Sequence, residues 1–62
     1  MWIVEQRDPS GRWFVRATVH EQQGAKHYAR LYKTNNPKLR FRYRRADEEG
    51  EPLDDSEPIE VV

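Results

Sequence analysis

Two short stretches near the N-terminus, residues 2–5 and 12–18, are rich in the apolar, β-branched and aromatic residues that favour strands. Successive side chains of a strand point to opposite faces, so the parity of each position assigns its face. Between them, residues 8–11 read Asp-Pro-Ser-Gly, which favours a tight turn and predicts a β-hairpin. The side chains expected to face the core are Trp2, Val4, Trp13, Val15 and Ala17. The opposite face would carry Ile3, Glu5, Arg12, Phe14, Arg16 and Thr18.

A helical pattern follows over residues 21–33, where apolar residues recur at spacings of three and four. The predicted buried stripe consists of Ala25, Tyr28, Ala29 and Tyr32. Residues 18–21 fit the capping box that begins many helices. Asn35-Asn36-Pro37 predicts the end of the helix, because the residue before a proline disfavours helical geometry.

Residues 38–45 read Lys-Leu-Arg-Phe-Arg-Tyr-Arg-Arg, which predicts a third strand with one apolar and one cationic face. The order strand, strand, helix, strand indicates an α+β fold. We expect a small β-β-α-β domain over residues 1–46, with an antiparallel sheet of three strands packed on one helix. Residues 59–62 are rich in strand formers, so they are expected either to add a fourth strand or to bind another protein as a linear peptide.

Charge is divided sharply between the two parts of the chain, although the formal net charge is zero. Residues 1–46 hold all 11 Lys and Arg, and residues 47–62 hold eight acidic residues and no basic one. The acidic tail spans residues 47–62, and its residues 47–58 have the composition of disordered segments. Its candidate binding residues are Asp47, Glu48, Glu49, Glu51, Asp54, Asp55 and Glu57.

The cationic sheet face is a second candidate site. Several small domains bind single-stranded nucleic acid on such a face, where cations contact phosphates and an aromatic ring stacks on a base. The residues assigned to this basic face are Arg12, Phe14, Arg16, Lys38, Arg40, Arg42 and Arg44. Two simpler interpretations remain, a solvated face that resists aggregation and a tail that only improves solubility. The tail could also imitate a phosphate backbone, or fold over the basic face of its own domain.

No residue pattern indicates catalysis, a metal site or a cofactor. His20 and His27 are seven residues apart with no good ligand between them, and the two serines have no evident histidine partner. We therefore expect a protein that is not an enzyme and has no small-molecule substrate. There is no cysteine, no apolar run of about 20 residues and no signal-peptide pattern at the N-terminus, which favours a cytoplasmic protein without membrane contact.

The layout of residues 2–45 resembles small phage-encoded accessory proteins. The features that carry the resemblance are Trp2, Val4, Asp8, Gly11 and Trp13, then a helix with Ala25 and Ala29, then the arginine-rich strand. The resemblance implies a viral protein in the host cytoplasm that inhibits a host complex such as RNA polymerase or a CRISPR effector. Two alternatives remain, direct nucleic-acid binding by the basic face with an autoinhibitory tail, and an antitoxin whose acidic tail wraps a basic toxin.

Overall fold

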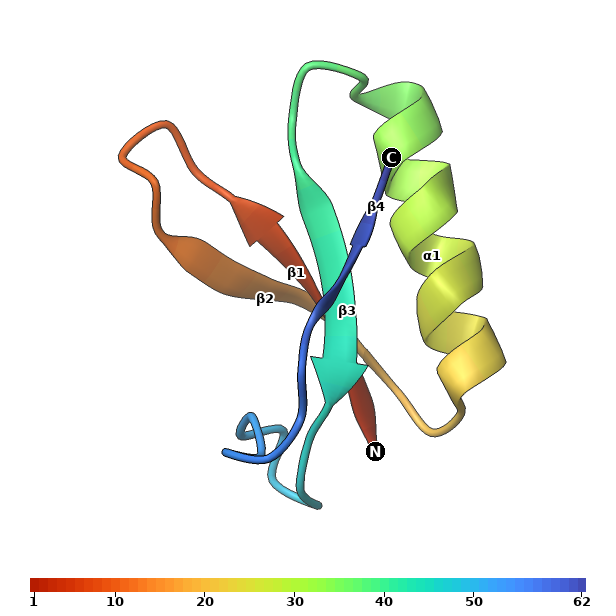
Figure 1. Ribbon diagram of the computed structural model, residues 1–62. Coiled ribbons are helices and arrows are strands. Elements are labelled where there is room, and N and C mark those ends of the chain that lie inside the picture. Colours follow the sequence, from red (N-terminus) through yellow and green to blue (C-terminus); the bar gives the residue numbers. More distant parts are fainter.

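The computed structural model describes residues 1–62 and places one helix against one face of a four-stranded sheet (Figure 1). The elements are β1 (Trp2–Arg7), β2 (Trp13–Val19), α1 (Gln22–Asn35), β3 (Phe41–Arg45) and β4 (Ile59–Val61). The strand order is β2-β1-β3-β4, and every neighbouring pair is antiparallel. This arrangement confirms the predicted α+β fold, and the C-terminal segment supplies the fourth strand.

The core lies between α1 and the two central strands. Ala25 and Ala29 are fully buried on α1, because their small side chains let the helix approach the sheet closely. They pack with Val4 of β1 and Tyr43 of β3. Around this centre lie partly buried apolar side chains of β1, β2, α1 and β4, namely Trp2, Ala17, Val19, Tyr32 and Val61. Since Val61 belongs to β4, the C-terminal strand is part of the same core.

A β-bulge in β2 reverses the predicted faces of that strand's first half. Val4 lies opposite Ala17, whereas Glu5 lies opposite Val15, so Arg16 is an extra residue in the ladder. One extra residue moves every side chain beyond it to the other face. The prediction that Trp13 and Val15 face the core is therefore wrong, because both lie on the face opposite α1.

The side chains that this reversal brings to the helix side are Phe14 and Arg16. The Arg16 guanidinium lies 5.3 Å from the ring centre of Tyr32 on α1, which shows the direction of its side chain. The assignment of Phe14 and Arg16 to the basic face is therefore also wrong. Ala17 keeps its predicted place in the core, since it lies on the other side of the bulge.

The helix and the third strand begin later than predicted. Thr18 is part of β2, and the residue before α1 is Glu21, which makes no side-chain capping hydrogen bond. The predicted capping box is therefore wrong. β3 starts at Phe41, because Leu39 belongs to a turn in which its N–H donates to the carbonyl of Asn36 at 3.0 Å.

The segment between β3 and β4, which we call the acidic loop (residues 47–58), is tied to the end of β3. Asp47 Oδ1 accepts hydrogen bonds from the N–H groups of Glu49 and Glu51 at 2.9 and 3.0 Å. Ser56 Oγ accepts from the N–H of Arg45 at 2.8 Å, and Ala46 forms a bridge with Pro52. The loop thus has a defined backbone despite its polar composition.

Gly50→Ala tests whether the acidic loop is ordered in solution, and Gly24→Ala in α1 serves as its comparison. Gly50 has φ of +84° and nothing within 4 Å of an added Cβ, so Gly50→Ala is expected to cost about 1 kcal/mol of backbone strain alone. Gly24 lies in α1 with room for a methyl group, so Gly24→Ala is expected to stabilise by about 0.5 kcal/mol. Urea unfolding followed by tryptophan fluorescence measures both, and a neutral Gly50→Ala would contradict an ordered loop.

Candidate charged interaction surfaces

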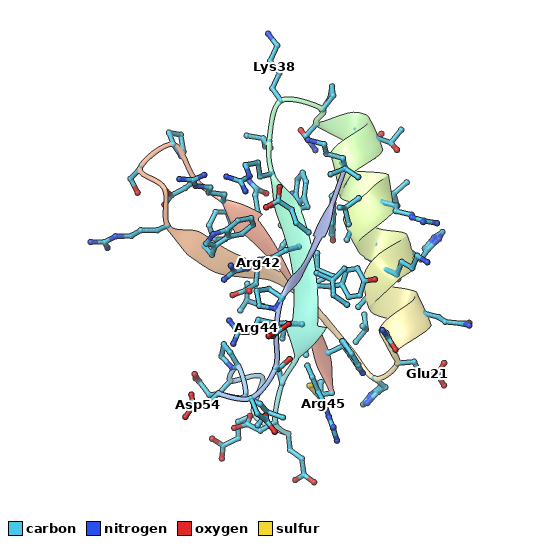
Figure 2. The ribbon with its side chains drawn as sticks, in the orientation of Figure 1. Glu21, Lys38, Arg42, Arg44, Arg45 and Asp54 are labelled. Atoms are coloured by element: carbon cyan, nitrogen blue, oxygen red, sulfur yellow. The ribbon has the colours of Figure 1, made fainter.

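Three arginines alternate along and just before β3 on the open face, by which we mean the sheet face opposite α1. They are Arg40, Arg42 and Arg44, as predicted from the alternation of residues 38–45. Figure 2 labels Arg42 and Arg44 along β3. The register of the sheet sets Arg42 between Glu5 of β1 and Glu60 of β4. The fold therefore places two carboxylates beside the open-face arginines.

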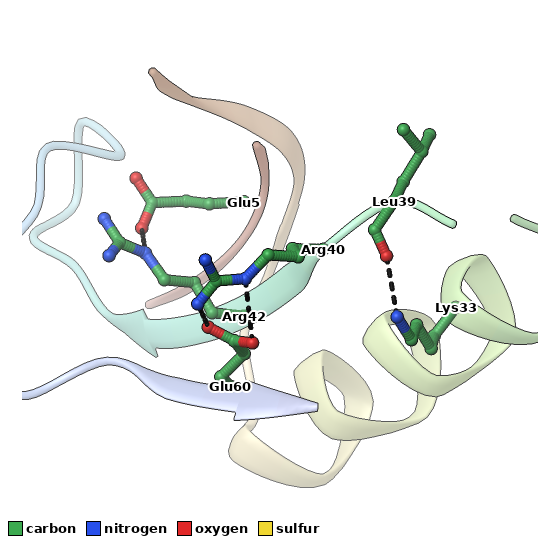
Figure 3. Close-up of polar contacts among 6 residues, drawn as sticks. All are labelled: Glu5, Lys33, Leu39, Arg40, Arg42 and Glu60. Carbon is green, nitrogen blue, oxygen red and sulfur yellow. Dashed lines mark hydrogen bonds and ion pairs between the residues drawn. The ribbon is translucent and has the colours of Figure 1, made fainter. Parts of the chain in front are cut away.

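Arg42 is held by a carboxylate and an aromatic ring together. Its Nε donates to Glu5 Oε1 at 2.9 Å (Figure 3). Glu5 is only 5% exposed and is the one buried charged residue of the protein. The Arg42 guanidinium also lies 4.1 Å from the ring centre of Trp13, a favourable cation–π distance. Arg42 thus neutralises a buried charge, and its own charge is largely satisfied within the fold.

Arg40 forms a bidentate ion pair with Glu60 of β4 (Figure 3). Its Nε donates to Glu60 Oε2 at 3.0 Å, and its Nη2 donates to Glu60 Oε1. These hydrogen bonds raise the pKa of Arg40 and hold the pKa of Glu60 below its usual value. Because Glu60 belongs to β4 and Arg40 directly precedes β3, this pair links the C-terminal strand to its neighbour on the open face of the sheet.

The other end of the open face is covered by the acidic loop. Arg44 Nη2 donates to the carbonyl of Leu53 at 3.2 Å, and Arg44 Nε is buried without a partner. Ile3, which is paired with Arg44 and shares its face, is fully buried. All three open-face arginines therefore contact other parts of the protein.

The remaining residues predicted for the basic face lie elsewhere. Arg12 and Lys38 are exposed outside the strands, and Lys38 lies at the opposite end of the molecule from Asp54 of the acidic loop (Figure 2). The aromatic ring on the open face is that of Trp13, not Phe14. The sequence pattern did place Glu5 on this face, but it did not identify Glu5 or Glu60 as partners of the arginines.

The acidic loop holds the largest group of charges without a partner of opposite sign. The two ion pairs of the protein join Arg40 to Glu60 and Arg42 to Glu5, so no loop carboxylate takes part in one. Asp47 is half-buried and holds the turn. The other carboxylates of the loop are exposed on Glu48, Glu49, Glu51, Asp54, Asp55 and Glu57.

Acid is expected to weaken the fold through Glu60 and Asp8. Hydrogen bonds from Arg40 lower the pKa of Glu60 from 4.5, and hydrogen bonds from Ser10 and Arg12 lower the pKa of Asp8 from 3.8. A depressed folded-state pKa contributes stability above the unfolded value that is lost as pH falls through the folded value. The urea midpoint should therefore fall steadily below about pH 4.5. Glu60→Gln, which lacks this carboxylate, should show a shallower decline, and equal slopes would contradict the prediction.

No group of three or more His, Asp or Glu side chains is placed to hold a metal ion. No helix has both the length and the apolar character needed to cross a membrane. No protein-family model, curated protein or solved structure matches this chain.

Proposed function

We propose that this chain is a non-enzymatic interaction protein whose acidic loop binds the cationic, nucleic-acid-binding surface of another protein. One observation carries the proposal. The six exposed carboxylates of the loop have no cationic partner, whereas the open-face arginines are engaged within the fold. A dense set of fixed negative charges is attractive to a surface that evolved to neutralise phosphates.

The order of the loop supports a role in recognition. The Asp47 turn, the Ala46–Pro52 bridge and the hydrogen bond to Ser56 set the path of the backbone before a partner arrives. A preformed loop loses less conformational entropy on binding than a disordered tail does. The carboxylates would then be presented in one arrangement, which favours one shape of partner over others.

The resemblance of residues 2–45 to phage accessory proteins suggests the biological setting. In that setting the partner is a host complex that handles nucleic acid, of the RNA polymerase or CRISPR effector type, in the host cytoplasm. The acidic loop would occupy the path of the nucleic acid and so inhibit the complex. Competition with nucleic acid is then the mechanism to test.

The test is capture from a bacterial lysate on the immobilised full chain, followed by elution with duplex DNA or with RNA. The proposal expects a cationic nucleic-acid-binding protein to be captured and then released by nucleic acid. A partner that nucleic acid does not displace would contradict the proposed competition. A chain with Arg12→Gln and Lys38→Gln, which loses exposed cations outside the acidic loop, should capture the same protein.

Direct nucleic-acid binding by the open face is the second candidate, with the tail as an autoinhibitor. The specific observation in its favour is that the C-terminal part of the chain contacts two arginines of that face. Glu60 forms an ion pair with Arg40, and the Leu53 carbonyl accepts a hydrogen bond from Arg44. Under this mechanism Glu60→Gln frees Arg40 and should raise affinity for single-stranded DNA at low salt by about tenfold. Unchanged affinity in that variant would eliminate this candidate.

A further inference from the structure

β2 is an edge strand whose outer side is free. The strand order β2-β1-β3-β4 leaves β2 paired with β1 alone, and its seven residues make it the longest strand. Phe14 and Val15 in its first half are 40% and 46% exposed. A long edge with exposed apolar residues is a template for pairing with another strand.

The backbone groups of the first half of β2 are oriented for such pairing. The N–H of Asp8 donates to the carbonyl of Arg12 at 2.8 Å, so this opposed pair is a hydrogen-bonded one. Hydrogen-bonded and non-hydrogen-bonded pairs alternate in an antiparallel ladder. The N–H and C=O groups of Trp13 and Val15 therefore point away from β1, toward the free edge.

One flank of α1 extends the same surface. Lys26 and Arg30 line a hollow with Ile59 and Val61, so their flank faces β4. Helical spacing of 100° per residue places Tyr28 and Leu31 on the opposite flank, toward β2. These two side chains are 42% and 45% exposed.

Phe14 lies on the same side of the sheet as this flank of α1. The neighbouring Arg16 already reaches the ring of Tyr32, 5.3 Å away. Exposed apolar side chains from the strand and from the helix therefore border a single edge. A strand added at β2 would cover them on the helix side.

We propose that this edge pairs with the same edge of a second copy of the chain. A two-fold axis at Val15 joins the two four-stranded sheets into one antiparallel sheet of eight strands, with both helices on the same face. Phe14 then lies opposite Arg16 of the second copy, a cation beside a ring, and this contact occurs twice.

The charges along the β2 edge are compatible with a second copy of the chain as its partner. No two like charges are directly opposed in this pairing, and the formal net charge of zero produces no overall repulsion between copies. The bulge at Arg16 limits the paired residues to Phe14, Val15 and Arg16 of each copy, because the side chains beyond Arg16 lie on the reversed faces. The acidic loop follows β3, on the other side of the central strands, and stays free in the dimer. The inference is thus independent of the proposed function.

Sedimentation equilibrium of the full chain from about 1 µM to about 1 mM tests the dimer. We expect a reversible monomer–dimer equilibrium. Val15→Lys sets two lysines against each other at the two-fold axis and should raise the dissociation constant at least about tenfold. The matched control Val62→Lys changes a fully exposed valine beyond β4 and should leave the constant unchanged. A strict monomer, or loss of the dimer in Val62→Lys alone, would overturn the proposal.

A second pair of variants tests the register while keeping the edge polar in both cases. Phe14→Glu places a carboxylate opposite Arg16 of the second copy and should retain the dimer. Phe14→Lys places two cations together and should raise the dissociation constant at least about tenfold relative to Phe14→Glu. Circular dichroism of both variants confirms that the exposed position tolerates the change. Equal dissociation constants for the two variants would overturn the proposed register.

Discussion

Replacing Arg42 by alanine is expected to destabilise the protein by about 3 kcal/mol, the largest effect among the three open-face arginines. The variant leaves Glu5, which is 5% exposed, without its ion-pair partner and removes the nearer of the two guanidinium groups over Trp13. A domain of this size has a total stability on the order of 3 to 9 kcal/mol, so the variant should approach unfolding. Urea denaturation followed by tryptophan fluorescence measures the change.

Two comparisons make the Arg42 result specific. Arg12→Ala removes an exposed arginine and should change stability by less than about 0.5 kcal/mol. The double variant Glu5→Met with Arg42→Met replaces the buried pair by apolar side chains and should recover most of the loss. If Arg42→Ala costs no more than Arg12→Ala, the open-face arginines are not structural, and the account of the basic face is wrong.

Neutralising the acidic loop is expected to weaken partner binding by about 100-fold, which corresponds to about 2.7 kcal/mol. The variant changes the exposed carboxylates to amides at Glu48, Glu49, Glu51, Asp54, Asp55 and Glu57. It keeps Asp47, whose carboxylate holds the turn through two backbone N–H groups. Because the removed charges act at long range, both the association rate and its dependence on salt should fall. Surface binding kinetics with the captured partner at several salt concentrations measure both.

The matched control for the loop variant is the chain with Arg12→Gln and Lys38→Gln. It removes exposed charge of the other sign and should bind with nearly unchanged affinity. The melting temperatures of both variants should stay near that of the parent, because none of the changed side chains makes an ion pair in the structure. Equal affinity and equal salt dependence in the loop variant would show that the partner binds elsewhere.

The two turns that begin at Asp8 and Asp47 show what local sequence could predict. Asp8-Pro9-Ser10-Gly11 was recognisable as a turn, and the structure confirms it with hydrogen bonds to Asp8 Oδ1 and a positive φ at Gly11. Asp47 and Gly50 repeat the same spacing and the same bonds. The acidic composition of this segment indicated disorder, although the Asp-x-x-Gly spacing was a sufficient signal for a turn.

The faces of β2 could not be predicted from alternation, for a physical reason. Residues 13–17 carry apolar side chains at both parities, so either register buries some of them. The bulge at Arg16 is set by the pairing of β2 with β1 and by packing against α1, which are tertiary effects. The order of elements was predictable because each has its own period and its own boundary residues.

The partners of the open-face arginines depend on the sheet register as well. Glu5 is far from Arg42 in the chain, and Glu60 meets Arg40 only because β4 pairs with β3. Alternation along residues 38–45 could place the cations on one face. It could not show that carboxylates from β1 and β4 would reach them, which changes the face from a free cationic surface to a structural network.

The most direct test of that central claim is an NMR titration of the ¹⁵N-labelled full chain with a single-stranded DNA oligonucleotide, following the arginine Nε–Hε signals. The hydrogen bonds to Glu60 and Glu5 predict slow exchange with water for Arg40 and Arg42 relative to the exposed Arg12. At physiological salt the DNA should leave both signals unshifted. Exchange as fast as that of Arg12, together with a shift of both signals on adding DNA, would contradict the account.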